Sequence, residues 1–418
     1  MAKTNAMIAE TIELHGHIID SLTLSKVLDI ILRDGGRYRI NRFYIGATST
    51  DISHAEILVE ARDSPSLEAI LHELQQHGAQ RQTGDATVSP APADGVFPDG
   101  FYSTTNLDTS VRFQERWLPV EPVEMDCGIV ITGGGDDLAA RCTPLHRVKR
   151  SDAVVVGDSG VRVVPLERPD PHDSFSFMGS DVSTERPKEL VVKAVANAMV
   201  QTRAAGKQIL FVGGPAIVHT GSAQYLESIV KAGWIDILFA GNALAAHDIE
   251  RALFGTSLGI EIESGKSMRH GHEHHLRAIN RIRAAGSIRG AVETGLLAAG
   301  IMHACIKRNV DVVLAGSIRD DGPLPDVITD SIQAQDAMRR LVPGVGVALM
   351  VATTLHSVAT GNLLPASVRT VCVDSDADTV IKLMDRGSHQ AFGLITDCEF
   401  FLKELAAHLP GSSTQRGA

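Results

Sequence analysis

Residues 209–214, Ile-Leu-Phe-Val-Gly-Gly, open the part of the sequence that decides the fold: a short apolar run that ends in two glycines. Similar runs that end in small or polar residues follow at 235–242, 312–317, 347–354, 371–374 and 394–397. Buried strands that alternate with helices are typical of a parallel sheet covered on both faces. The sequence therefore predicts an open α/β domain, which we place at 171–418.

The strand ends of this domain are where a ligand is expected. In open α/β sheets ligands bind outside the carboxyl ends of the strands, where helix N-termini direct their N–H groups into a crevice. Gly213 and Gly214 form a turn that lets the backbone approach a phosphate, although the GxGxxG spacing is absent and the pair alone would indicate only a turn. A second glycine turn at 240–248 opens into a helix, and the two turns together predict a dinucleotide site.

Two neighbouring carboxylates, Asp320 and Asp321, follow another of these strands in a loop rich in Gly and Pro. Paired carboxylates can share a proton and raise one pKa, which suits general acid–base catalysis. The alternative is that either residue only caps a turn.

A histidine-rich segment, His270-Gly-His272-Glu-His274-His275, has the composition of a metal site. A zinc site needs its ligands on one face, usually with a further ligand from elsewhere, and hydrogen bonding of neutral imidazoles also explains such a segment well. We expect no metal cofactor, and metal binding by this segment stays an open alternative.

The first 170 residues predict two smaller parts. Residues 1–92 show a βαββα pattern typical of a small ferredoxin-like α+β module, and residues 93–170 predict a small β-rich subdomain. The polar stretch 101–106, which ends in Asn106, and the nearby Arg112 are either a hydrogen-bonded loop or substrate contacts.

Composition limits the partners. The chain has 418 residues, a formal charge of -11 and no run of Lys and Arg, which disfavours nucleic acid and anionic membranes and favours a small molecule. Five cysteines lack CxxC spacing, and no apolar run approaches the roughly 20 residues of a membrane span. We therefore expect a cytoplasmic protein.

Several longer motifs carry a family resemblance: GGPAIVHTG, FAGNALAAHDIE, LAGSIRDDGPLPDV, ATTLHSVATGNLLP and VCVDSDADTV, with FYSTTN and MDCGIVI upstream. With these motifs the sequence resembles the LOR/SDH family, whose characterised members are NAD-dependent ornithine cyclodeaminases. The resemblance covers nearly the whole chain. It implies a Rossmann-like, deoxyhypusine-synthase-like NAD-binding domain, NAD as cofactor and an amino-acid substrate. Separately, we expect a homo-oligomer, dimer or tetramer.

The expected site residues combine this resemblance with the strand ends. The cofactor site is expected to contain Gly213, Gly214, Asn242, Ala243, Ser317, Asp321, Thr353, Thr354, Leu355, His356, Asp374, Asp397 and Cys398. Asp320 and Asp321 are the catalytic candidates, and Asn106, Arg112 and Arg319 are the substrate-binding candidates. Asp374 is expected to face the adenosine ribose and to favour NAD over NADP, unless it merely caps the next helix.

The reaction that the resemblance implies is L-ornithine to L-proline plus ammonia, with NAD reduced and reoxidised within one cycle. Two alternatives belong to other classes. One is a deoxyhypusine-synthase-like aminobutyl transferase, which ranks lower because no lysine has a matching context. The other is a non-enzymatic NAD-sensing regulator in which the N-terminal module mediates dimerisation.

Overall fold

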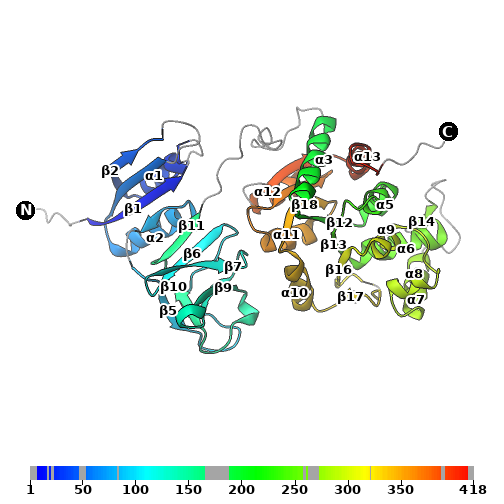
Figure 1. Ribbon diagram of the computed structural model, residues 1–418, viewed down its shortest axis with the longest axis horizontal. Helices are drawn as coiled ribbons and strands as arrows, with labels where there is room; N and C mark the ends of the chain where they lie inside the picture. The colour runs from blue at the N-terminus through cyan, green and yellow to red at the C-terminus, as the bar shows by residue number, and fades with distance from the viewer. Residues whose placement is uncertain are drawn as a thin grey trace, which may run out of the picture. The chain divides into compact units, whose positions relative to one another are not determined.

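The computed structural model describes residues 7–16, 18–19, 23–46, 53–81, 84–164, 188–257, 260–261, 273–320, 322–386 and 391–412. The chain forms two compact units, 1–170 and 171–418 (Figure 1).

The N-terminal module of the first unit has the order β1 (Ile8–Gly16), α1 (Thr23–Arg33), β2 (Arg37–Tyr44), β3 (Ser53–Ala61), α2 (Ser64–Gln76) and β4 (Gln80–Arg81). Its strands pair antiparallel in the order β2-β3-β1-β4, the ferredoxin-like arrangement. Alternation along the strands buries Ile12 and Leu14 against apolar residues of α1 and α2, such as Val27 and Ile70. The predicted βαββα pattern is present, with one short strand added.

The rest of the first unit is a seven-stranded sheet in the order β11-β6-β7-β9-β8-β10-β5. Its elements are β5 (Thr87–Pro90), β6 (Asp108–Phe113), β7 (Arg116–Glu121), β8 (Gly128–Thr132), η1 (Gly135–Asp137), β9 (Ala139–Thr143), η2 (Leu145–Arg147), β10 (Ala153–Val156) and β11 (Val161–Val164). β5 already pairs with β10, so the chain enters this sheet before residue 93, where we placed the boundary.

The second unit alternates strands and helices, as predicted. Its first half contains α3 (Lys188–Ala204), β12 (Gln208–Gly213), α4 (Ala216–His219), α5 (Ala223–Lys231), β13 (Ile237–Gly241), α6 (Asn242–Phe254), β14 (Thr256–Ser257), β15 (Ile260–Glu261), α7 (His274–Ala284), α8 (Ile288–Glu293) and α9 (Ile301–Arg308). Its second half contains β16 (Asp311–Ala315), β17 (Val327–Ile328), α10 (Ser331–Leu341), β18 (Val345–Val351), α11 (Thr354–Leu363), β19 (Arg369–Asp374), α12 (Ala377–Arg386), β20 (Ala391–Ile395) and α13 (Cys398–His408).

The large sheet of this unit is parallel throughout, in the order β17-β16-β13-β12-β18-β19-β20. Apart from the short edge strand β17, this is the 3-2-1-4-5-6 order of a dinucleotide-binding Rossmann fold. The strand order reverses between β12 and β18, so the ligand crevice is expected at the carboxyl ends of these two strands.

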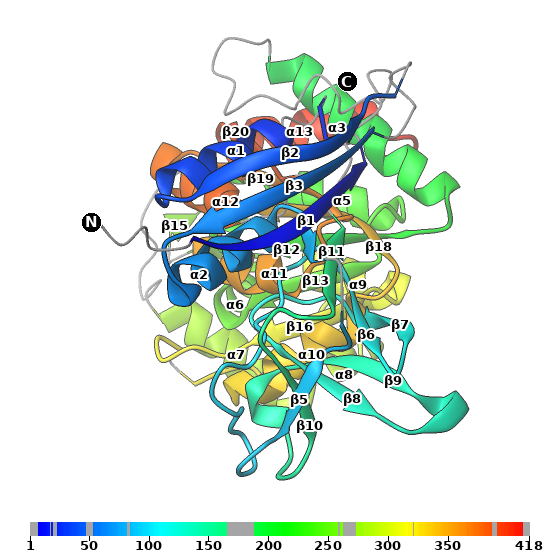
Figure 2. The ribbon, with the colours of Figure 1, turned by 90° about the vertical axis from the view of Figure 1, so that its left-hand side faces the viewer.

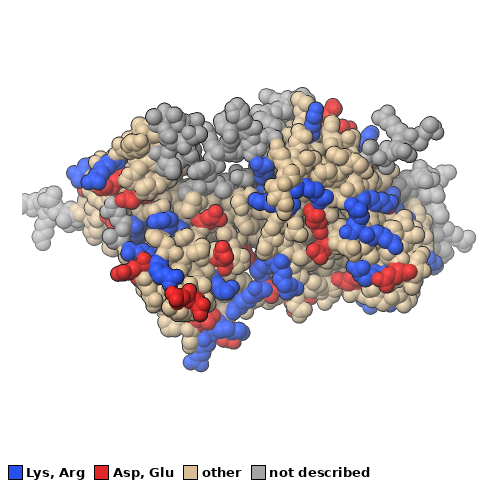
Figure 3. All heavy atoms as spheres, viewed as in Figure 1, with Lys and Arg blue, Asp and Glu red and all other residues tan. Residues whose placement is uncertain are grey.

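Two apolar cores sandwich the sheet. One packs α3, α5, α6, α9 and α13 against residues such as Phe211, and the other packs α10, α11 and α12 against residues such as Phe239. Figure 1 shows α10, α11 and α12 on one side of the strands and α5, α6 and α9 on the other. Within the described ranges, no helix has the length and apolar character that crossing a membrane requires. Acidic and basic side chains are interspersed on the face drawn in Figure 3.

Candidate cofactor and active site

At the switch point of the sheet, the backbone after β12 packs directly against the backbone at the end of β18. The Gly214 N–H donates a hydrogen bond to the Val351 carbonyl (3.0 Å), and a Cβ added to Gly214 would overlap the carbonyl oxygen of Ala352. Ala352 itself has a φ of 54°, in the left-handed region. A side chain on Gly213 would meet Leu244 and Phe211. The predicted glycine pair therefore allows the turn after β12 to pack closely against its neighbours, and a role of this turn in binding a pyrophosphate stays a prediction.

Helix α6 begins at the end of the neighbouring strand β13 and starts with the predicted Asn242. Asn242 is buried, and its side-chain oxygen accepts a hydrogen bond from the Leu324 N–H (3.0 Å). Its amide thus ties the start of α6 to the loop that follows β16. Ala243, the next residue, is half-buried.

His356 of α11 lies over Gly241, at the end of β13. A Cβ on Gly241 would stand 3.0 Å from the His356 ring, and His356 Nδ1 is 3.4 Å from the Thr353 hydroxyl. Burial lowers the pKa of His356, and the nearby Asp320 carboxylate opposes this effect. The fold thus brings His356, Asp320 and the β13 end, which are far apart in sequence, to one edge of the sheet. The lowered pKa favours the neutral form of the His356 imidazole at pH 7.

The loop after β16 holds the catalytic candidate Asp320. Its carboxylate accepts a hydrogen bond from the Ser317 N–H (2.8 Å), while the Ser317 hydroxyl accepts one from the Arg319 N–H (3.1 Å). Asp320 is half-buried, and Ser317 and Arg319 are exposed. One carboxylate oxygen of Asp320 therefore shapes the loop, and the catalytic role of this residue stays a prediction. Asp321 lies outside the described residues.

Helix α11 presents the remaining predicted residues of the β18 end. Thr353 is the residue before its first turn, and the Thr354 hydroxyl lies 3.5 Å from that of Thr379. Leu355 is 73% exposed, although it is a large apolar residue at the edge where a ligand is expected. Its side chain has the apolar surface that can cover a ring of a bound cofactor.

Asp374 ends β19, and its carboxylate accepts a hydrogen bond from the Asp376 N–H (3.0 Å). The cap of α12 is a different residue: Asp376 accepts hydrogen bonds from the N–H (3.1 Å) and hydroxyl (2.7 Å) of Thr379. The helix cap of α12 is therefore Asp376 and not Asp374.

Asp397 and Cys398 begin the last helix. Asp397 caps α13 through the Glu399 N–H (2.6 Å), and the buried Cys398 sulfur lies 3.3 Å from the Thr220 hydroxyl and 3.6 Å from that of Ser222. The fold thus joins the β20 end to the segment after α4, a proximity without any sequence signal.

The other substrate candidates belong to the first unit. Asn106 is 9% exposed, and Arg112 of β6 is half-buried with its guanidinium 3.5 Å from Asp85. Thr104, in the same polar stretch, donates to the Glu124 carbonyl (2.6 Å), as the hydrogen-bonded-loop interpretation expects. Contact of Asn106 and Arg112 with substrate stays a prediction.

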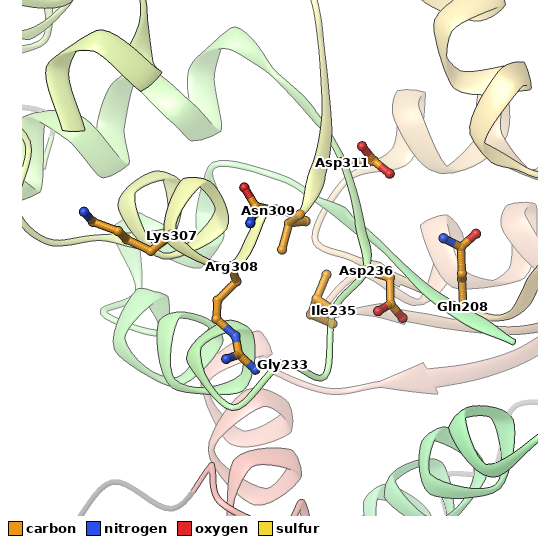
Figure 4. Close-up of a pocket in the computed structure, with 9 residues that line it drawn as sticks. Gln208, Gly233, Ile235, Asp236, Lys307, Arg308, Asn309 and Asp311 are labelled. Carbon is orange, nitrogen blue, oxygen red and sulfur yellow. The ribbon is translucent and has the colours of Figure 1, made fainter. Parts of the chain in front are cut away.

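A cavity of about 440 Å³ lies elsewhere in the second unit (Figure 4). Its lining includes Gln208, Asp236 and Asp311, which lie at or just before the amino ends of β12, β13 and β16. Asp236 is paired with Arg203 at 2.9 Å. This cavity is therefore at the edge of the sheet opposite to the glycine turns.

A histidine network lies beside α6 and was not predicted from the sequence. The fully buried Glu250 lies 2.9 Å from His247 Nδ1 and accepts a hydrogen bond from the Thr256 hydroxyl (2.9 Å), which is 2.8 Å from His274 Nδ1. The ring of His219 packs edge-on to that of His247. The spacing of His247 and Glu250 on one helix was the available signal. Of the histidine-rich segment, His270 and His272 lie outside the described residues.

Comparison with known families covers most of the chain. Residues 193–405 match the family described as arginine dihydrolase ArgZ-like, C-terminal, Rossmann fold, and residues 9–107 match the LOR/SDH bifunctional enzyme conserved region. Residues 108–192 match the first region of the ArgZ-like C-terminal part.

Individual relatives agree. A protein of Methanothermobacter thermautotrophicus named ornithine cyclodeaminase is 51% identical over 94% of this chain and 95% of its own length. The solved apo structure of ArgZ, an arginine dihydrolase from the ornithine–ammonia cycle in cyanobacteria, is 36% identical, with a TM-score of 0.83, over 97% of this chain and 59% of ArgZ.

A third relative, AgrE, has been solved as a ternary complex with ornithine and NAD+; it is 38% identical, with a TM-score of 0.52, over 96% of this chain and 57% of AgrE. AgrE of Nostoc is named a bifunctional arginine dihydrolase/ornithine cyclodeaminase. With the parallel Rossmann sheet, these matches confirm the resemblance that the motifs indicated. The chain therefore belongs to the LOR/SDH family, together with the archaeal proteins named ornithine cyclodeaminase.

Proposed function

We propose that this protein is an NAD-dependent ornithine cyclodeaminase that converts L-ornithine to L-proline and ammonia. The observation that carries the proposal is about 50% identity to proteins of this name over nearly their whole length. AgrE, solved with both ornithine and NAD+, supports the same substrate and cofactor. The deoxyhypusine-synthase-like transferase and the NAD-sensing regulator gain no comparable support.

The second unit fits NAD. Three features support NAD binding: the strand order, the glycine turn at Gly214 and the carboxylate of Asp374. Rossmann domains use such features to bind a pyrophosphate and a free ribose. When bound at this edge, NAD would supply a reversible hydride acceptor for Cα of ornithine, so that the overall reaction has no net oxidation. The further predicted cofactor residues along this edge are Asn242, Ala243, Ser317, Thr353, Thr354, Leu355, His356, Asp397 and Cys398.

In this proposal, Asp320 transfers the protons. Ornithine must lose a proton from its α-ammonium group before Cα is oxidised, and from its δ-ammonium group before that nitrogen attacks Cα. Ring closure then expels the original α-nitrogen as ammonia, which leaves as it takes up a proton. Asp320 is half-buried with one oxygen fixed by the Ser317 N–H, so the other oxygen is oriented to accept and return these protons.

The substrate carboxylate needs a cation. Arg319, next to Asp320, is exposed and is the candidate on the second unit; Arg112 and Asn106 are the candidates on the first. The neutral imidazole of His356 lies at the same edge as Asp320 and is suited to a hydrogen bond with the cofactor or substrate rather than to charge pairing. Asp321 remains a second candidate base by sequence alone.

A direct assay tests the function. The purified chain is incubated with ¹⁵N-labelled ornithine at saturating NAD, and proline and ammonia are measured. Ornithine labelled only at the α-nitrogen should release labelled ammonia and give unlabelled proline, because the δ-nitrogen stays in the ring. Absence of both products, or label retained in proline, would contradict the proposed reaction.

Finer features complete the proposal. We place the protein in proline formation and in the cytoplasm, where its five buried cysteines would stay reduced, and we expect a dimer or tetramer. Because a recycled cofactor need not leave between turnovers, protein purified without added NAD should release NAD or NADH on denaturation.

A further inference from the structure

One face of the ferredoxin-like sheet carries a cluster of three side chains that the proposed reaction does not use. Ile12 and Leu14 of β1 point into the core, so Glu13 and His15 point to the opposite face. His54 of β3 pairs directly with His15 in the antiparallel register. Figure 2 looks onto this face, with β1, β2 and β3 in front of α1 and α2.

The three side chains converge. The rings of His15 and His54 are stacked with centroids 4.2 Å apart and planes 18° apart, and His15 Nε2 is 3.2 Å from Glu13 Oε2. Each residue offers one ligand atom, and the three atoms lie within 4.8 Å of one another. Two imidazoles and a carboxylate are thus gathered from two strands at a point where the sheet has no covering helix of its own module.

A second observation points to a ligand. Nε2 of His54 is buried, yet among the described residues it has no hydrogen-bond partner. A buried polar nitrogen without a partner costs about 1–3 kcal/mol, and a bound ion is one of the explanations for such an atom. An ion that accepts the lone pair of this nitrogen would remove that cost.

We propose that Glu13, His15 and His54 bind a divalent transition-metal ion of the zinc class. A set of two His and one carboxylate is a known zinc-binding combination that leaves a fourth position for water, whereas Mg²⁺ and Ca²⁺ prefer oxygen ligands. Tetrahedral ligands about 2.0–2.1 Å from zinc stand about 3.3 Å apart. The 3.2 Å separation of His15 and Glu13 matches this value, and the His54 ligand atom lies within 4.8 Å of both. Because the two imidazoles are stacked, binding one ion requires the rings to reorient.

The site is independent of NAD and ornithine, because all three residues lie in the N-terminal module. Its presence or absence therefore does not depend on the proposed reaction. Bound metal would join β1 to β3 and stabilise the module by mass action.

The test is calorimetric titration of zinc chloride into the chelator-treated full chain, purified without a histidine tag. His15→Gln and His54→Gln should each abolish one zinc-binding event or weaken it more than about 100-fold, since loss of a direct ligand should exceed the 10- to 100-fold typical of outer partners. Glu13→Gln should also weaken this event. His72→Gln, a change of an exposed histidine on α2 of the same module, should leave it intact.

Zinc bound elsewhere, for example by the 270–275 segment, contributes equally to all these proteins and cancels in the comparison. Circular dichroism and NAD binding establish that each variant is folded. If the wild type binds no zinc, or if it and the two histidine variants titrate alike, the proposed site is wrong.

Discussion

The backbone of Gly214 lies directly against the carbonyl group of Ala352, with no room for a side chain between them. The two residues leave the adjacent central strands β12 and β18 at the point where the strand order reverses. Since Ala352 has a left-handed φ of 54° and its N–H donates to the Val373 carbonyl (3.0 Å), it cannot easily move away. The close packing of the turns after β12 and β18 therefore depends on a glycine at 214.

Gly214→Ala should lower both stability and NAD affinity. The added methyl group forces β12 and β18 apart, which should reduce the free energy of unfolding by about 1–3 kcal/mol and weaken NAD binding by roughly tenfold or more. Urea unfolding and NAD titration measure the two effects. Gly361→Ala is the control, because that position in α11 is open and Ala favours helix; it should be neutral or stabilising. Equal behaviour of the two variants would refute the tight contact.

Asp320→Asn should separate chemistry from binding. Asn keeps an oxygen that can accept from the Ser317 N–H but cannot take a proton, so kcat should fall by roughly 10²-fold or more. NAD affinity should change little. Asp330→Asn, which preserves the cap of α10 given by the Gln333 N–H (2.8 Å), is the control and should turn over normally. Lost NAD affinity with near-normal turnover would make Asp320 a cofactor ligand instead.

Asp374→Ser should alter the choice of nucleotide. A carboxylate that accepts hydrogen bonds from the ribose contributes about 1.5–3 kcal/mol and repels a 2′-phosphate, so NAD affinity should fall and its advantage over NADP should narrow. Dissociation constants for both nucleotides at one ionic strength measure this. Asp376→Ala removes the cap of α12 and should cost about 1 kcal/mol of stability without changing the preference. A wild-type protein that prefers NADP would overturn the role of Asp374.

Asp248 should make stability depend on pH. This fully buried carboxylate accepts hydrogen bonds from the Ile301 and Met302 N–H groups (2.9 and 2.8 Å), but burial outweighs them and raises its pKa to about 6. The folded chain then binds more protons than the unfolded chain between about pH 4 and 6. Stability should therefore fall as pH rises through this window, by about 3 kcal/mol in total.

Chemical unfolding at several pH values tests this slope against Asp248→Asn, which should lack it. Carboxyl chemical shifts measured by NMR report the titration of Asp248 directly. A pKa near 4, with the same pH dependence in both proteins, would show that the hydrogen bonds from the N–H groups of α9 fully offset the effect of burial.

The sequence alone predicted the fold class because its information is local. Apolar runs that end in Gly213-Gly214 or Gly241-Asn242 identify buried strands followed by helices, and they identify the ligand edge wherever the strands lie in the sheet. The ferredoxin-like module could be predicted for the same reason. The alternation of apolar residues at Ile12 and Leu14 and their helical spacing in 23–33 are patterns among residues close in sequence. The longer motifs indicated the family for the same reason.

Tertiary structure alone decided which distant residues meet. The strand order β16-β13-β12-β18-β19-β20 places His356 over Gly241 and Cys398 beside Thr220, and no periodicity records those contacts. It also decided that Asp376, rather than Asp374, caps α12, because two nearby aspartates satisfy the same sequence pattern and only backbone geometry selects one. Likewise the pairing of His15 with His54 depends on strand register, which is set by the packing of a whole sheet face and not by either strand alone.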